Sequence, residues 1–111
     1  MAIAVFIQEG RAIDYTPTSD VAAGGVVVQG DLVGVARSPI PANAPGSLAT
    51  AGVFEFPKAA GAGSGIAAGT KVYWDATNRV VTATAQGNTY LGKTTKAAAD
   101  ADASVHVRLS Q

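Results

Sequence analysis

One octapeptide of the chain has the residue types and spacing to bind a nucleoside triphosphate. Gly87–Thr94 reads Gly-Asn-Thr-Tyr-Leu-Gly-Lys-Thr and matches the phosphate-loop pattern at every fixed position. In a working phosphate loop, backbone N–H groups of a glycine-rich turn hold the phosphates. The lysine reaches the β and γ phosphates, and the hydroxyl binds Mg²⁺. A small nucleotide-binding protein is therefore one alternative function for this chain.

The surroundings of the octapeptide argue against a phosphate loop. Such a loop follows the first strand of a sizeable parallel α/β sheet, whereas only a short remnant of chain follows Thr94. No apolar strand ending in aspartate lies downstream to hold the magnesium ion. Tyr90 and Leu91 inside the octapeptide favour burial. The sequence therefore predicts a turn followed by a β-strand here.

The other chemically versatile residues do not suggest a catalytic or metal-binding set. The single histidine, His106, is expected on the polar face of the last strand, and only Asp100 and Asp102 lie near it in sequence. We therefore predict no catalytic residue, no metal site and no cofactor. Tyr73 and Trp74 could stack on a sugar, so a carbohydrate-binding surface module is a second alternative. As neighbours on a strand they point to opposite faces, which favours Trp74 as a core residue.

Composition limits the remaining possibilities. The 111 residues suffice for one domain, and eight basic residues balance eight acidic ones, so no charge pattern favours nucleic acid. The chain has no cysteine. Its apolar start lacks the basic segment of a signal peptide, and no stretch approaches the roughly 20 apolar residues of a membrane span. We expect a soluble protein made in the cytoplasm, with neither nucleic acid nor a membrane as partner.

The elements that would carry these residues are short β-strands. Thirteen glycines and five prolines imply many turns, and alanine and valine dominate the apolar residues. Val26–Val28 is an unbroken apolar run of the kind buried on both faces. Asp75–Asn78 predicts the turn of a hairpin, and Ser104–Leu109 alternates as a half-buried strand. Only Thr94–Ala103 resembles a helix in composition, and it suits a loop equally well. The prediction is an all-β fold, a compact β-barrel-like or sandwich domain.

The sequence also repeats itself, which predicts a domain built from two similar halves. Turns and apolar runs return in the same order, at about 21–58 and again at about 66–110. The matching segments are Val21–Gly24 with Ile66–Gly69, Leu32–Gly34 with Tyr90–Gly92, and Ala42–Leu48 with Ala99–Val105. In this interpretation residues 21–111 form a single β domain, and residues that recur are framework.

Residues 1–20 lie outside this repeat and are predicted to form an N-terminal hairpin or arm. Ala4–Ile7 and Ala12–Thr16 have strand composition, and the intervening Gln8–Arg11 is typical of a turn. An extended segment of this kind can add a strand to a sheet edge of another protein. Equally, the hairpin could complete the protein's own sheet.

Several framework segments resemble one family of small tailed-phage and prophage proteins, the capsid cement or head decoration proteins. The resemblance covers nearly the whole chain. It is carried by Phe6–Gly10, Ile13–Thr16, Gly30–Ala36, Gly52–Lys58, Gly69–Asp75 and Val105–Leu109.

The resemblance implies a non-enzymatic virion protein on the outer capsid surface. Such a protein is made in the cytoplasm of the bacterial host, binds the major capsid protein and stabilises the head, commonly as a homotrimer. For this chain we expect the capsid-binding anchors to be Phe6, Ile7 and Tyr15. The carbohydrate-binding alternative would then be a module on the virion surface.

Overall fold

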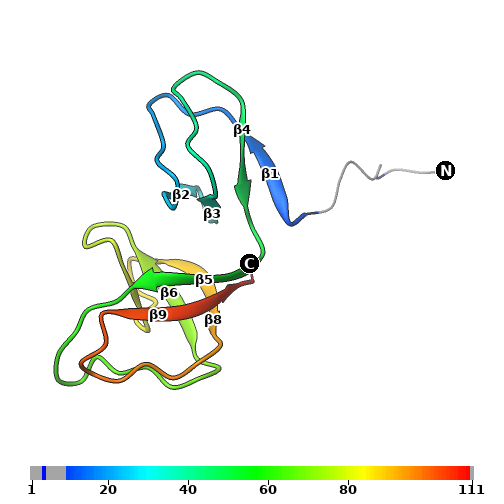
Figure 1. Cartoon of the computed structure of the whole chain (residues 1–111). Coiled ribbons are helices and arrows are strands. Elements are labelled where there is room, and N and C mark those ends of the chain that lie inside the picture. The colour runs from blue at the N-terminus through cyan, green and yellow to red at the C-terminus, as the bar shows by residue number, and fades with distance from the viewer. Residues whose placement is uncertain (1–3, 5–9, 111) are drawn as a thin grey trace.

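The computed structural model describes Ala4 and residues 10–110, and these residues form nine β-strands in two antiparallel sheets (Figure 1). The first sheet has the order β1 (Ala12–Tyr15), β4 (Gly46–Ala49), β3 (Leu32–Ala36), β2 (Val26–Gln29). The second has the order β5 (Gly52–Pro57), β9 (Ser104–Leu109), β8 (Thr89–Thr94), β6 (Lys71–Asp75), β7 (Val80–Thr82). The described residues contain no helix. The all-β prediction is confirmed, and the two sheets fit a sandwich, whereas a closed barrel is not confirmed.

The two sheets have the same internal plan, and each is built from one half of the chain. The order β1-β4-β3-β2 of the first sheet corresponds to β5-β9-β8-β6 of the second, to which β7 is added. An isolated bridge flanks each sheet, Val21 with Ile40 in the first and Ile66 with Ala98 in the second. The fold is therefore two similar halves. The division into residues 1–20 and 21–111 stays a prediction. In the sheets, β1 takes the position in the first sheet that β5 takes in the second.

Matching hydrogen bonds at the turn before β2 and β6 show how close this correspondence is. The Gly24 N–H donates to the Ala36 carbonyl at 2.6 Å, and the Gly69 N–H donates to the Thr94 carbonyl at 2.8 Å. Both glycines have positive φ angles, 83° and 77°, which a residue with a Cβ rarely adopts. The recurring Ala-Ala-Gly therefore ends in the same left-handed turn in both halves.

One pair of corresponding sites exchanges its bulk between the two halves. In the first sheet, a Cβ added to Gly46 would lie 2.7 Å from Cγ2 of Ile40, so Ile40 occupies that space. In the second sheet, Val105 pairs with Phe56 as Gly46 pairs with Tyr15, and the bridge residue there is the small Ala98. The sequence repeat set Val105 against Leu48, which is wrong by two residues at this strand, because Leu48 pairs with Ala36 as Val107 pairs with Thr94. The small residue therefore lies on the strand in the first half and at the bridge in the second.

The buried apolar side chains form two groups. The larger one joins β3 to the second sheet: Val33, Val35, Phe56, Ile66, Val72, Trp74, Val81, Leu91, Ala98, Val105, Val107 and Leu109. The smaller one lies on the other face of the first sheet and contains Ala36, Ile40 and Leu48, with Ile13, Tyr15, Val21 and Val27 packed against it. Strand β3 therefore packs on both of its faces.

The predicted hairpin around Asp75–Asn78 is confirmed, as β6 and β7 pair on either side of it. The Asp75 carboxylate accepts hydrogen bonds from the Thr77 N–H at 3.0 Å, the Asn78 N–H at 3.1 Å and Asn78 Nδ2 at 2.8 Å. The helix-like stretch after β8 forms a bridge, a turn and bends. This alanine-rich stretch forms a loop because Asp100 and Asp102 accept hydrogen bonds from backbone N–H groups, which competes with helix formation.

Replacing Asp75 with alanine tests the turn and its dependence on pH. The hydrogen bond from the Asn78 side chain, followed by that from its backbone, holds the pKa of Asp75 below its usual 3.8. A carboxyl group with a lowered pKa stabilises the fold above its unfolded pKa, and this contribution is lost as the pH falls through the folded pKa. We expect Asp75→Ala to lower the melting temperature at pH 7, with the difference from wild type shrinking below pH 3.8. Circular dichroism melts across this range check it, and a constant difference would contradict the assignment.

Candidate functional site

The phosphate-loop octapeptide forms a turn and a strand, as its surroundings predict. Strand β8 takes up Thr89–Thr94 and pairs with β6 on one side and β9 on the other. Its backbone N–H groups therefore belong to a sheet and are not arranged around a phosphate. A Cβ added to Gly92 would lie 2.0 Å from the Arg108 carbonyl oxygen, so this glycine permits a close approach between strands.

The two residues that would serve a bound nucleotide lie on opposite faces of β8. The Thr94 hydroxyl is buried, donates to the Ala67 carbonyl at 2.7 Å and accepts from the Thr70 N–H at 3.0 Å. Lys93 is exposed on β8, where it lies opposite Arg108 of β9. Thr94 thus fastens the turn before β6.

The single histidine lies on the surface, as expected. Its neighbouring carboxylate is Glu55, and neither Asp100 nor Asp102, the two carboxylates near it in sequence, is its partner. His106 Nε2 is 3.2 Å from Glu55 Oε1, across the β5–β9 pair, and both side chains are exposed. Asp100 accepts a hydrogen bond from the Gly65 N–H at 2.6 Å, and Asp102 accepts one from the Ala99 N–H at 2.8 Å. Within the described part of the chain, no three metal-ligating side chains gather. Nothing in the sequence indicated that Glu55 would be the partner of His106, because the two residues are 51 positions apart.

A buried lysine that sequence reasoning did not single out also has a place in the framework. Lys58 is only 4% exposed, and its Nζ donates to the carbonyls of Ala59 and Asp102, both at 2.8 Å. It thereby ties the loop after β5 to the loop before β9.

The aromatic residues do not form one platform. Trp74 is 6% exposed and packs on Phe56, with ring centroids 6.0 Å apart. Tyr73 lies on the opposite face of β6 and is half-buried against Tyr90, with centroids 5.7 Å apart. The expected core position of Trp74 is therefore confirmed, and Tyr73 and Trp74 cannot stack on one sugar.

The expected capsid anchors are only partly within the described structure. Phe6 and Ile7 lie outside the described residues, as does most of the first strand of the predicted hairpin. Tyr15 is half-buried on β1 and packs against the smaller core group. The Thr50 hydroxyl donates to the Gly10 carbonyl, which fixes the start of the described body beside the end of β4.

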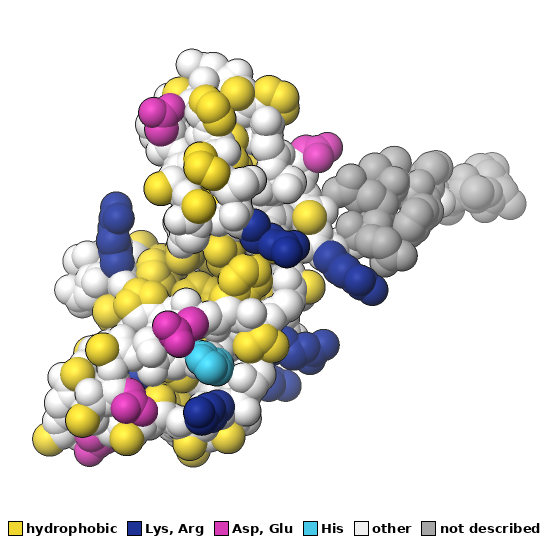
Figure 2. Space-filling view, viewed as in Figure 1, with side chains coloured by type: hydrophobic (Ala, Val, Ile, Leu, Met, Phe, Trp, Pro, Cys, Tyr) yellow, Lys and Arg dark blue, Asp and Glu magenta, His cyan; other side chains and the backbone are white. Residues whose placement is uncertain are grey.

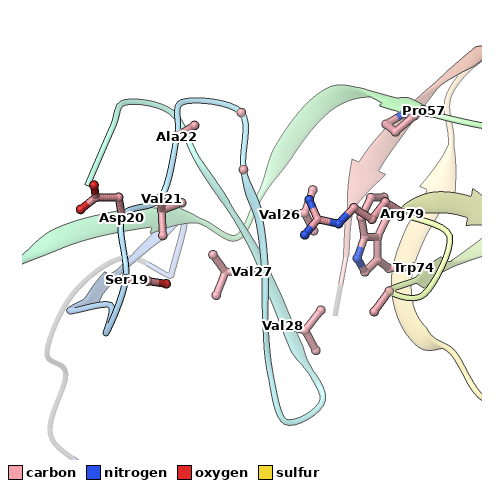
Figure 3. A pocket seen from close by; sticks show the side chains of 13 residues that line it. Ser19, Asp20, Val21, Ala22, Val26, Val27, Val28, Pro57, Trp74 and Arg79 are labelled. Carbon is pink, nitrogen blue, oxygen red and sulfur yellow. The ribbon is translucent and has the colours of Figure 1, made fainter. Parts of the chain in front are cut away.

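A groove of about 640 Å³ lies between the first and second sheets at β2. Figure 2 shows apolar surface gathered where the two sheets meet. The valine run was expected to be buried on both faces, but this is wrong: β2 is the edge of its sheet, and Val28 is 38% exposed. The walls of the groove are the loop before β2, the valines of β2, and Pro57, Trp74, Ala76 and Arg79 (Figure 3).

Arg79 reaches into this groove from a backbone position that usually belongs to glycine. Its φ angle is 56°, and its N–H donates to the Asp75 carbonyl at 2.7 Å to close the β6–β7 turn. A left-handed conformation is uncommon for a residue with a long side chain. Figure 3 shows the arginine side chain extending from this turn beside Trp74 toward β2.

These features describe an all-β protein whose most distinctive surface is an open strand edge beside an apolar groove. The family model for phage cement protein matches residues 7–109, and the chain belongs to that family. It is therefore a structural protein associated with the phage capsid, and its place is in the virion. Comparison with curated proteins and with solved structures gives no significant match. Among the described residues, no helix is long and apolar enough to cross a membrane.

Proposed function

We propose that this protein is a non-enzymatic cement protein that binds the outer surface of the phage head, contacts the major capsid protein and stabilises the shell. The observation that carries the proposal is the family match over residues 7–109. The described surface is consistent with it, since Thr94, Asp100 and Asp102 use their polar groups for the protein's own turns.

The N-terminal segment supplies the first attachment in this proposal. Phe6 and Ile7 are the apolar anchors, because they precede the body of the protein in an uncharged run. Tyr15 packs against the smaller core group and so holds β1 to the body of the protein. Assembly as a homotrimer would multiply modest contacts through effective concentration.

Binding to heads tests the function directly. Purified protein mixed with expanded, undecorated heads should sediment with them and raise their resistance to heat. Light scattering on the free protein should give three times the mass of one chain. Failure to sediment with heads, or no gain in heat resistance, would overturn the cement proposal, and a monomer would overturn the trimer.

Truncating the two apolar anchors tests the attachment. The double variant Phe6→Ala with Ile7→Ala should bind heads at least about a hundredfold more weakly, since each fully buried apolar side chain contributes about 1.5–3 kcal/mol. Its melting temperature should stay that of wild type, because the anchors serve the partner. Val53→Ala is the matched control, since Val53 is 57% exposed on β5. Equal binding by the double variant and the control would remove the anchors from the proposal.

A further inference from the structure

Strand β2 offers an unused line of backbone hydrogen-bonding groups. Paired residues in an antiparallel ladder alternate between bonded and non-bonded positions. The Ala36 N–H donates to the Gly25 carbonyl at 2.9 Å, so Gly25 and Ala36 are a hydrogen-bonded pair. Because bonded pairs alternate along the ladder, the next residue of β2 bonded to β3 is Val27. Val26 and Val28 therefore direct their N–H and C=O groups away from β3, toward the open edge.

This edge lacks the features with which proteins usually block strand addition. Charges, prolines and very short strands protect exposed edges. Edge strand β7 has three residues, β5 carries Glu55 and Pro57, and β1 carries Asp14. By contrast, β2 consists of three valines and one glutamine. It is the edge best suited to accept a further strand.

The groove beside β2 provides a place for the side chains of such a strand. Val26 packs toward the larger core group and Val27 toward the smaller one, so Val26 and Val28 share the groove face. Trp74 lies across from them, with the Arg79 side chain beside it (Figure 3). An apolar residue of the added strand would contact the valines and the indole ring.

Arg79 specifies the charge of the occupant. It is exposed, and within the described part of the chain no carboxylate lies within ion-pair distance of it. The groove's own carboxylate, Asp20, accepts a hydrogen bond from the Ala42 N–H at 2.8 Å. Figure 3 places Asp20 well away from Arg79, on the other side of β2. An occupant that fits therefore carries an acidic residue at the Arg79 end.

We propose that the groove receives an extended segment of the major capsid protein, which pairs with the free edge of β2 and presents a carboxylate to Arg79. This inference rests on the proposed cement function. A second copy paired through its own β2 fits less well, because β2 has three valines and one glutamine and so no carboxylate to present to Arg79. Gly10 lies beside the end of β4, toward the opposite edge of the first sheet from β2.

The consequence is a protein with two attachments at opposite edges of its first sheet. The N-terminal segment leaves beside β1, and the capsid strand adds beside β2. Each attachment raises the effective concentration of the other. A single subunit can in this way join two neighbouring capsid subunits.

Two groove variants and one matched control test the proposal in saturation binding to undecorated heads. Arg79→Gly suits the left-handed φ angle, so its melting temperature should match or exceed that of wild type, while its affinity falls about tenfold through loss of a charge-assisted hydrogen bond. Val28→Pro removes an outward N–H and replaces one valine of the groove face, and it should weaken binding similarly without losing a bond to β3. Lys93→Glu serves with Arg79→Glu as a charge-matched pair, and only Arg79→Glu should weaken binding.

The possible results separate the groove from the function. Wild-type affinity in all folded groove variants would overturn the groove assignment and leave the cement function standing. If the wild-type protein itself does not bind heads, both the groove assignment and the cement function are wrong. If Arg79→Gly and Val28→Pro bind heads normally but change the mass of the free protein, the occupant is a second copy, which also overturns the proposal.

Discussion

Alanine at position 92 is expected to unfold the protein or to lower its melting temperature severely. The added Cβ would lie 2.0 Å from the Arg108 carbonyl oxygen and 2.9 Å from its carbonyl carbon. Both are backbone atoms of the adjacent strand, so no side chain can rotate to make room. The strands β8 and β9 would have to separate, at a cost of about 3 kcal/mol or more. For a domain of this size, that is a large share of the total stability, about 5–15 kcal/mol.

The glycine at the corresponding place in the first sheet gives a graded comparison. A Cβ at Gly34 would lie 2.8 Å from Cβ of Leu48, a smaller overlap than the 2.0 Å approach at Gly92. Gly34→Ala should therefore destabilise less than Gly92→Ala. A Cβ at Gly10 would have no atom within 4 Å, so Gly10→Ala should have the same stability as the wild-type protein. Denaturant titrations of the three variants check the order, and wild-type stability in Gly92→Ala would show that β8 and β9 do not approach so closely.

Truncation of Trp74 should produce the second large loss, about 3–5 kcal/mol, as for other buried aromatic residues. The indole ring fills the larger core group and packs on Phe56. Tyr73 is its matched control, because the two residues are neighbours on β6 and face opposite sides. Tyr73→Ala removes a half-buried ring that packs mainly on Tyr90, so its cost should be clearly smaller.

The same pair of variants separates a framework role from a sugar platform. Unfolding in urea, followed by circular dichroism because Trp74 is the only tryptophan, measures both losses. The conservative Trp74→Phe should retain most of the stability. Equal losses in Trp74→Ala and Tyr73→Ala would contradict the core assignment of Trp74.

Local signals in the sequence were sufficient for much of the fold. Asp75 and Asn78 form a turn with each other, so four consecutive residues predict the β6–β7 hairpin. The repeated Ala-Ala-Gly ends at Gly24 and Gly69, where the left-handed backbone depends on the glycine alone. The apolar Tyr90 and Leu91 inside the phosphate-loop octapeptide likewise indicated a turn and a strand there.

Features that depend on distant partners could not be predicted. The apolar composition of Val26–Val28 suits a buried strand, and only the order of the sheet makes β2 an edge. Likewise, β1 pairs with β4, more than 30 residues away, and this pairing brings Tyr15 against the smaller core group. The sequence did not indicate that Arg79 has a left-handed backbone conformation, because such a turn position is normally recognised by a glycine.

The placement of the strands also bears on the order in which the chain can fold during synthesis. The first sheet is complete in sequence at Ala49, and the second starts at Gly52, so the chain passes between the sheets once. All strands of the first sheet have therefore been translated before the second sheet begins. Until the second half arrives, Val33 and Val35 lack the surface on which they pack. The first half would thus emerge from the ribosome as a paired but one-sided sheet, and the second half would complete it.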